Sequence, residues 1–390
     1  MNDGHMPIVY FGNDWFAENR TSSHHIAKRL AERHPLLYVE SPGLRAPKAN
    51  ARDARKLWQK LRRAASRPSH IHRQMWQMTL PQIPFRRLPL VGALNQRLGR
   101  TLVRRALRQL GFERPLLWFA VPHVASLAGQ LGERGLVYYC IDDYASLPDV
   151  DRREVRRMDE ALARQADQVF VASRALLEAK QTLNPHTAYS PHGVDVELFQ
   201  QALDPALPLA AAARHLAHPV IGFFGLLEAW TDLELLSYLA RSRPEWTFLL
   251  IGRAAVDVSA LRSLPNVVLP GPQPHETLPR WAKAFDAAIV PLRQNEQVRH
   301  SNPLKVREYL AMGKPVVSVR IPEVERFADC IGIARTHEEF LAQIEDALKT
   351  DSEDKRAARR KAVAGMTWEA RVDEALGIVH GRLQANGQAR

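Results

Sequence analysis

The chain has 390 residues, of which 46% are hydrophobic, so it exceeds one ordinary hydrophobic core and is predicted to form two domains. It contains no apolar run long enough to span a bilayer and no charged-then-apolar leader, which predicts a protein that stays in the cytoplasm. Its two cysteines, Cys140 and Cys330, are far apart and lack zinc-ligand spacing, which argues against a disulfide framework or a zinc site.

Short apolar runs alternate with helical patterns along the whole chain, which is typical of α/β proteins with parallel sheets. We expect a first doubly wound domain over residues 1–201, an Ala/Pro-rich linker over 202–218 and a second doubly wound domain over 219–365. The ten predicted strands lie in residues 7–12, 36–40, 115–121, 135–141, 168–173, 219–225, 246–252, 266–271, 287–292 and 314–319.

Ligands of parallel α/β sheets bind beyond the carboxyl ends of the strands, so the residues that follow each strand are the first candidates for a site. Polar or aromatic groups follow the first strand, and one histidine follows the third. They are Asn13, Asp14, Trp15, His24 and His123. The alternative is structural, because Thr21 is placed to cap the first helix and His24 could then face solvent.

Residues 45–108 hold many Lys and Arg residues but a single acid, Asp53, so the net charge of +12 is concentrated in this segment. No zinc-finger spacing, aromatic RNA-binding motif or basic heptad array accompanies it, so nucleic acid is not the expected partner. Interleaved apolar residues suggest amphipathic segments on an anionic membrane surface. These are Leu57, Trp58, Leu61, Trp76, Leu80, Phe85 and Leu90. A solvated insertion without a partner, or a nucleic-acid-binding surface, remains as an alternative.

The fourth strand delivers two adjacent acids, Asp142 and Asp143, into the loop at its carboxyl end. Such carboxylates are candidates for a general base, with a turn and helix cap as the alternative. The later pair Asp149 and Asp151 follows Pro148 and is interpreted as a helix N-terminus, where acids are favoured, and not as a metal site.

Two features of the second half could bring the chain close to a phosphate. Gly225 ends a buried strand and permits a close backbone approach, and Arg253 follows the next strand as a fork-shaped donor.

The segment Ser301 to Val319 predicts a loop, a helix that begins at Pro303, a stop at Gly313 and a short strand. Lys305 and Glu308 are three residues apart and share one helix face near the N-terminus, where an anionic ligand is favoured. A surface salt bridge is the alternative interpretation.

The chain resembles the GT-B glycosyltransferases, in particular the family-4-like group of teichuronic-acid and exopolysaccharide synthesis, with a likeness to the glucuronosyltransferase of xanthan assembly. The resemblance covers nearly the whole chain. It rests on GNDWF, VYYCIDDY, ADQVFVAS, PHGVD, IGFFGLLEAWTDLELL, FLLIGR, NVVLPGPQPHETLP, NPLKVREYLAMGKPVVS and MTWEARV. It implies two Rossmann-like domains that face a central cleft, and a closing helix over residues 366–390 that crosses back toward the first domain.

By this resemblance the second domain holds a nucleotide-diphosphate sugar. Lys305 would neutralise the diphosphate and Glu308 would bind the ribose, while Gly225 and Arg253 line the site together with Asn302 and Tyr309. No metal or other cofactor is expected. The first domain would bind the acceptor through Asn13, Asp14, Trp15, His24 and His123.

The resemblance further implies a hexosyltransferase on the inner face of the plasma membrane that acts on a lipid-linked saccharide. His300 stands where many retaining relatives have a Glu, so we expect inversion with Asp142 or Asp143 as base. Arg253, Arg293 and Arg299 would suit a glucuronic acid donor, a diphosphate or plain surface charge. A nucleotide-sugar epimerase of the same fold is the alternative enzyme.

Overall fold

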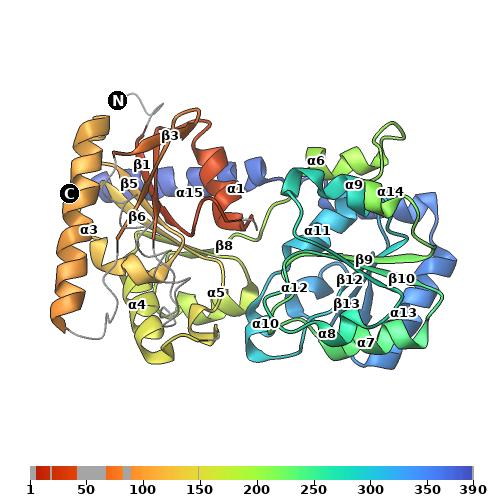
Figure 1. Cartoon of the computed structure of the whole chain (residues 1–390). Helices are drawn as coiled ribbons and strands as arrows, with labels where there is room; N and C mark the ends of the chain where they lie inside the picture. The colour runs from red at the N-terminus through yellow and green to blue at the C-terminus, as the bar shows by residue number, and fades with distance from the viewer. Residues whose placement is uncertain (1–5, 18–19, 42–66, 82–88, 148, 389–390) are drawn as a thin grey trace. The chain divides into compact units, whose positions relative to one another are not determined.

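The structure is a computed structural model that describes residues 6–17, 20–41, 67–81, 89–147 and 149–388. The chain divides into two compact units, each with its own sheet and core. The first unit comprises mainly residues 21–191, with the N-terminal strand and residues 371–390, and the second comprises mainly residues 192–370 (Figure 1).

The sheet of the first unit has eight strands in the order β3-β4-β2-β1-β5-β6-β7-β8, all parallel except β3, which is antiparallel to β4. The strands are β1 Ile8–Gly12, β2 Leu36–Glu40, β3 Ser69–His72, β4 Met75–Thr79, β5 Leu116–Phe119, β6 Gly135–Cys140, β7 Gln168–Val171 and β8 Thr187–Tyr189. The helices are α1 Ser22–Leu30, α3 Pro89–Leu110, α4 Arg152–Gln165, α5 Arg174–Gln181 and most of α15 Trp368–Gln388, with 3-10 helices η2 Pro122–Leu127 and η3 Tyr144–Ser146.

The sheet of the second unit has six parallel strands in the order β11-β10-β9-β12-β13-β14. They are β9 Val220–Phe224, β10 Thr247–Ile251, β11 Val267–Gly271, β12 Ala287–Val290, β13 Val316–Val319 and β14 Gly332–Ala334. The helices are α6 Val196–Gln200, α7 Leu233–Ser242, α8 Ser259–Arg262, α9 Leu278–Ala282, α10 Glu296–His300, α11 Leu304–Ala311, α12 Pro322–Glu325, α13 His337–Thr350 and α14 Glu353–Val363, with 3-10 helices η4 Gln201–Leu203, η5 Ala211–Ala213 and η6 His275–Thr277.

All ten predicted strands are present. Most of them are buried along their whole length, because helices cover both faces of a doubly wound sheet, and this burial explains their continuous apolar runs. Helix caps follow the sequence as well. Asp151 accepts hydrogen bonds from the backbone of Arg153 and Glu154 and so caps α4, as predicted, and Ser173 caps α5 through Leu176.

The segment predicted as a linker, residues 202–218, is part of the second unit. Ala202, Ala210 and Ala213 are at most 7% exposed and pack into its core. The chain passes between the units earlier, at Pro191 and His192, and again at Ala370 and Arg371. The Ala/Pro composition that suggested a linker therefore reflects short 3-10 turns with small buried side chains.

The basic segment 45–108 is described in part, and two of its residues correct the amphipathic prediction. β3 and β4 extend the sheet, Leu80 is 4% exposed, and Trp76 packs edge-on against Phe112 with ring centroids 5.9 Å apart. Trp76 and Leu80 therefore belong to the core side of the first unit. The predicted Leu57, Trp58, Leu61 and Phe85 lie outside the described residues.

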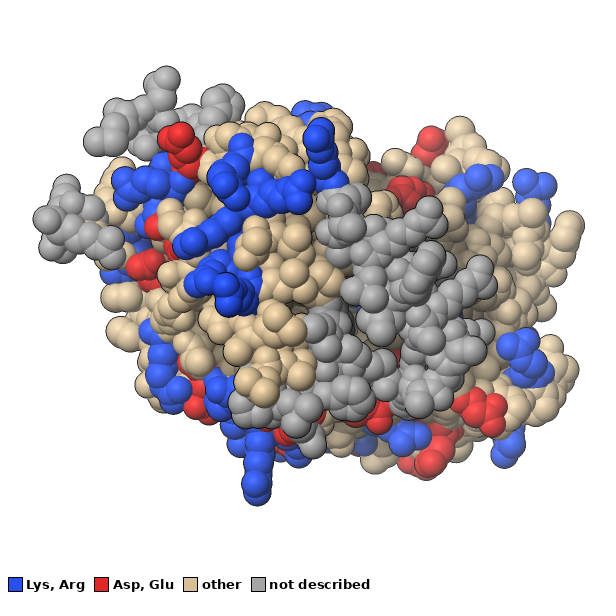
Figure 2. All heavy atoms as spheres, turned by 60° about the vertical axis from the view of Figure 1, so that its left-hand side comes forward, with Lys and Arg blue, Asp and Glu red and all other residues tan. Residues whose placement is uncertain are grey.

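The rest of the described basic segment is the 22-residue helix α3. Its inner face contributes Val103, Ala106 and Leu107 to the core, while Leu90 is 85% and Leu94 51% exposed. Figure 2 brings this side of the molecule forward and shows Lys and Arg side chains gathered beside an uncharged area. None of the described helices has both the length and the apolar composition to cross a bilayer.

Candidate functional site

The loop, helix and strand predicted over residues 301–319 are present as α10, a short loop, α11 and β13. Pro303 is the N-cap of α11 and Leu304 its first residue, one position later than predicted. Gly313 has φ +71° and ends the helix in the left-handed conformation that glycine adopts readily. This unit therefore places the N-terminal turn of α11 at the carboxyl edge of the second sheet.

The side chain of Lys305 lies against the end of β9. A Cβ atom on Gly225 would be 2.7 Å from Lys305 Cε and 2.8 Å from Nζ, and Gly225 itself has φ +144°. The ammonium also lies 5.1 Å from the ring centroid of Phe223, at cation–π distance. A glycine at residue 225 is thus required both by the backbone conformation and by the space that Lys305 occupies.

A second glycine supports the first. Gly252 ends β10 with φ +144°, and a Cβ there would be 1.9 Å from the carbonyl oxygen of Gly225. The two strand ends therefore approach so closely that neither position accommodates a side chain. Arg253 follows on the surface, where it is exposed and its carbonyl accepts the Leu227 N–H at 3.0 Å.

Lys305 and Glu308 are both half-buried, and in the described part of the chain no ion pair joins them. Burial raises the pKa of Glu308 to about 7, with Asp195 adding to the rise and Lys305 opposing it. Burial lowers the pKa of Lys305, and Glu308 opposes that shift. The predicted alternative of a surface salt bridge does not describe this pair, because both groups have lost water without forming an ion pair with each other.

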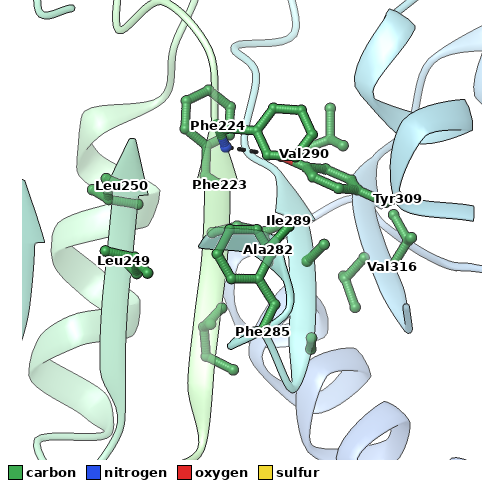
Figure 3. Close-up of a cluster of buried hydrophobic side chains, with 14 of the residues drawn as sticks. Phe223, Phe224, Leu249, Leu250, Ala282, Phe285, Ile289, Val290, Tyr309 and Val316 are labelled. Carbon is green, nitrogen blue, oxygen red and sulfur yellow. Dashed lines mark hydrogen bonds between the residues drawn. The ribbon is translucent and has the colours of Figure 1, made fainter. Parts of the chain in front are cut away.

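Tyr309 lies one helical turn after Lys305 on α11 and points into the core. It is fully buried, its hydroxyl accepts the Phe224 N–H at 3.0 Å, and the two rings pack edge-on with centroids 4.6 Å apart (Figure 3). Tyr309 was predicted to line the donor site. The structure places it behind that site, where it fixes the strand residue that precedes Gly225.

A buried polar cluster lies beneath the N-terminus of α11. Arg307 is 1% exposed and donates to Asn302 Oδ1 at 2.7 Å, and Asn302 Nδ2 donates to Glu323 at 3.4 Å. His192 belongs to the same region, since burial and the charge of Arg307 lower its pKa to about 3. Asn302, predicted as a donor-binding residue, is 6% exposed and secures the loop before the helix.

His300 is the last residue of α10, and its Nδ1 lies 2.9 Å from the carbonyl oxygen of Glu296. This geometry makes Nδ1–H the donor of a hydrogen bond within the helix. Arg293 and Arg299 flank the same segment and are exposed. They are available for a charged ligand and equally serve as surface charge.

In the first unit the structure brings the predicted residues after β1 together. His24 is 3% exposed. Its Nε2 donates to the Asp14 carbonyl at 2.9 Å and its Nδ1 accepts the Thr21 N–H at 3.1 Å. Trp15 packs on His24 and Tyr38, with centroids 5.5 and 5.0 Å away. His24 therefore takes part in the N-terminal cap of α1 with Thr21 and orders the loop, as the structural alternative held for Thr21. The part of that alternative in which His24 faces solvent is wrong, because His24 is buried.

Asp142 and Asp143 directly follow β6, and both are half-buried. Asp142 Oδ1 accepts the Asp143 N–H at 2.9 Å, and Asp143 Oδ2 accepts from the hydroxyl of Ser146, the last residue of η3. Asp143 is thus the N-cap residue of η3, as the alternative interpretation of a turn and helix cap held. The side chain of Asp142 holds the backbone N–H of Asp143 in place.

An ion pair that no sequence pattern indicates lies behind this loop. Lys180 pairs with Asp159, which also accepts from the Tyr138 hydroxyl, and Lys180 is 6% exposed. Burial acts to lower the pKa of Lys180, but Cys140, Asp159 and, least of the three, Asp143 together raise it. The pair joins α4 and α5 beneath the candidate base.

His123, also predicted to bind the acceptor, is the second residue of η2, which follows β5. It is 7% exposed and lines a cavity of about 760 Å³. Among the described residues no group of three or more His, Cys, Asp or Glu side chains could hold a metal ion.

Comparison with known proteins decides between the families that this architecture allows. Residues 209–350 match the family model described as glycosyl transferases group 1. Sucrose-phosphate synthase of Thermosynechococcus elongatus superposes with a TM-score of 0.71, covering 98% of this chain and all of that one at 16% identity. The chain has the GT-B fold, and its second unit carries a glycosyl transferases group 1 domain.

Two further proteins resemble this GT-B glycosyltransferase. HepE of Anabaena, solved with UDP and glucose, has a TM-score of 0.64 and 17% identity over 96% of this chain and all of its own. TuaH of Bacillus subtilis, named as a teichuronic acid biosynthesis glycosyltransferase, is 28% identical over 230 residues, or 55% of this chain. That match spans 57% of TuaH.

The predicted family, GT-B fold and transferase class are therefore confirmed for this GT-B glycosyltransferase. The likeness to the solved structures establishes the fold alone, since their identities are low. The residues predicted to bind donor and acceptor remain predictions that rest on the geometry of each unit.

Proposed function

We propose that the protein transfers a sugar from a nucleotide-diphosphate sugar to a saccharide acceptor, and that the N-terminal turn of α11 holds the donor. The observation that carries the proposal is the contact of the Lys305 ammonium with the Gly225 turn, with Glu308 one helical turn further on. A diphosphate placed at this turn meets a cation, open backbone and a helix N-terminus together.

The chemistry of the leaving group fits these residues. A departing nucleoside diphosphate gains negative charge in the transition state, and a preplaced ammonium stabilises that charge without reorganisation. Glu308 accepts a hydrogen bond from a ribose hydroxyl in this proposal. Lys305 supplies the positive charge, so the proposed reaction needs no divalent metal.

A uridine nucleotide is the donor that we propose to test first. HepE was solved with UDP and glucose, and TuaH is named for a cell-surface polysaccharide. By this reasoning the chain acts in polysaccharide synthesis. Glucuronic acid is the proposed sugar, because Arg253, Arg293 and Arg299 are exposed near the carboxyl edge of the second sheet.

The proposed mechanism is inverting, with Asp142 or Asp143 removing the proton from the acceptor hydroxyl. Both acids follow a buried strand of the first unit, and the rigid pair of Lys180 and Asp159 supports their loop. An inverting displacement needs one base and no covalent intermediate, so a single positioned carboxylate suffices.

The acceptor is proposed to be lipid-linked and the protein to bind the inner face of the plasma membrane. Exposed Leu90 and Leu94 head α3, and four exposed arginines follow on the same helix: Arg97, Arg104, Arg105 and Arg108. Two contributions hold a peripheral helix on a membrane. Apolar side chains enter the interface, and neighbouring cations bind the anionic head groups.

A thermal-shift screen of nucleoside diphosphates and nucleotide sugars tests the proposal, because a ligand of the folded state raises the melting temperature. We expect UDP and UDP-glucuronic acid to stabilise the protein, and transfer to require an acceptor. Isomerised nucleotide sugar in the absence of acceptor would instead support the epimerase. A protein that binds no nucleotide would contradict the donor site.

A further inference from the structure

The first unit has an open groove in one helix layer. Long helices cover the connections on either side, since α3 has 22 residues and α4 has 14. Between them β5 and β6 are joined through η2, a 3-10 helix of six residues. The short helix leaves the layer unfilled, and the cavity of about 760 Å³ lies between α3, η2 and α4.

Amide side chains line the part of this groove between α3 and α4. Gln96 Nε2 donates to the Ser126 carbonyl at 2.9 Å, and Gln130 Oε1 accepts from Arg100 at 3.2 Å. Each amide group is therefore held in place by one of its two polar atoms, the nitrogen of Gln96 and the oxygen of Gln130. The Gln96 oxygen can then accept a hydrogen bond from a ligand, and the Gln130 nitrogen can donate one. Gln165 adds a third amide from the end of α4.

The groove offers little net charge to a ligand. The acid and the arginine among its described lining residues are Glu154 and Arg157, which pair with each other at 3.1 Å. Small or apolar side chains form much of the remaining described wall, among them Val124, Leu127, Met158 and Ala161, beside the polar Asn95, His123 and Ser126. Fixed amides beside apolar patches suit a neutral, hydroxyl-rich ligand with C–H faces, which is the chemistry of a saccharide.

The groove begins at the edge of the sheet that carries the candidate base. His123 lines it and follows β5, the strand that pairs with β6, after which Asp142 comes. The Tyr144 hydroxyl donates to the Ala120 carbonyl and so ties the two loops together. At its other end Gln165 also lines a second cavity of about 880 Å³.

We propose that this groove binds the acceptor saccharide beyond its reacting sugar, through Gln96, Gln130 and Gln165. The inference rests on the proposed glycosyl transfer and adds a subsite that selects for chain length. A sugar held near Asp142 would extend its neighbouring units past His123 into the groove. An acceptor of several sugars is then bound more tightly than a single sugar.

The test compares Ala161→Trp with Ala357→Trp. Both alanines are exposed on helices, α4 and α14, and Ala161 lines the groove whereas Ala357 lies in the second unit. Binding is measured by calorimetry with cellotetraose, chitotetraose and a glucuronic-acid tetrasaccharide, each beside its monosaccharide, and with polyprenyl phosphate. UDP affinity and the melting temperature are measured for every variant.

We expect at least one tetrasaccharide to bind wild type more tightly than its monosaccharide, and Ala161→Trp to weaken that binding at least tenfold. Ala357→Trp should leave it unchanged, and both variants should keep the UDP affinity of wild type. Gln96→Leu should weaken binding severalfold without filling the groove, which separates recognition from blockage.

Three results would overturn the inference while leaving donor binding intact. In the first, Ala161→Trp leaves the tetrasaccharide affinity unchanged. In the second, wild type binds UDP but none of the tetrasaccharides. In the third, Ala161→Trp loses binding of polyprenyl phosphate and of no other ligand. The last result would show that the groove holds a lipid. Failure of UDP to bind wild type would count instead against the proposed function.

Discussion

The Lys305 ammonium occupies the space that a side chain at residue 225 would need, because Nζ lies 2.8 Å from the position of a Cβ on Gly225. This packing joins the end of β9 to the first turn of α11. Any ligand that contacts the Gly225 backbone therefore also meets the charge of Lys305.

Gly225→Ala is expected to weaken both folding and nucleotide binding. The new Cβ collides with Lys305, and φ +144° strains any residue but glycine, so we expect a loss of roughly 1–3 kcal/mol in the free energy of unfolding. Urea denaturation and UDP titration measure the two effects. Gly365→Ala is the control, since no atom lies within 4 Å of its added Cβ, and it should change neither.

Lys305→Ala should abolish most transfer while the fold is kept. Removal of a preplaced charge at a leaving group costs on the order of 100-fold in kcat, and the lost side chain opens space without burying a new polar group. Lys355→Ala, at an exposed position of α14, is the control. Wild-type turnover by a folded Lys305→Ala protein would exclude the proposed role.

Glu308 makes stability depend on pH in a direction that can be checked. Its pKa is about 7 in the folded protein and 4.5 as the ordinary value, so the folded state holds the proton over a range where the unfolded state has lost it. Its contribution to stability is therefore greatest below the ordinary pKa and falls as pH rises through about 7. The urea midpoint of wild type, relative to Glu308→Gln, should decrease between pH 5 and pH 8; a constant difference would contradict the raised pKa.

Asp142→Asn and Asp143→Asn should separate the base from the cap. The variant that removes the base is expected to lose roughly 100- to 10,000-fold in transfer, with UDP affinity unchanged because the donor residues belong to the second unit. Asp143→Asn should also lower the melting temperature, since Asp143 accepts from Ser146. Asp149→Asn controls for loss of an acid, because Asn tolerates its φ of +60°. Full activity in both Asp142→Asn and Asp143→Asn would remove this loop from the mechanism.

A double substitution of Leu90 and Leu94 by serine should reduce binding to anionic vesicles. Both side chains are more than half exposed, at 85% and 51%, so their loss costs little stability but removes the apolar part of the proposed membrane contact. Flotation with phosphatidylglycerol vesicles measures the effect. Leu203→Ser, at a residue 44% exposed in the second unit, should float as wild type does.

Sequence patterns predict those elements of this chain that are buried on both sides. The ten strands with continuous apolar runs were all recovered, whereas β3, β4, β8 and β14 were missed because they are short and their runs are mixed with polar residues. Periodicity alone cannot recognise such strands, since pairing with a neighbouring strand decides their formation.

The candidate site on α11 was predictable to the extent that it is local. Lys305 and Glu308 share a face because they are three residues apart on one helix, and that spacing is visible in the sequence. Tyr309 turns toward the core, and Asp195 comes close to Glu308 from more than a hundred residues earlier. The buried pair of Lys180 and Asp159 likewise depends on tertiary packing of two helices.

Residues 192–370 contain both points at which the chain passes to the first unit, and they hold those points together. The Val194 N–H donates to the Met366 carbonyl at 2.8 Å, and a Cβ on Gly193 would be 2.8 Å from the Trp368 nitrogen. The second unit therefore contains its own core and the contacts that hold its two chain connections side by side. An exchange of the first unit between related chains would therefore need two junctions, one in front of His192 and one after Ala370.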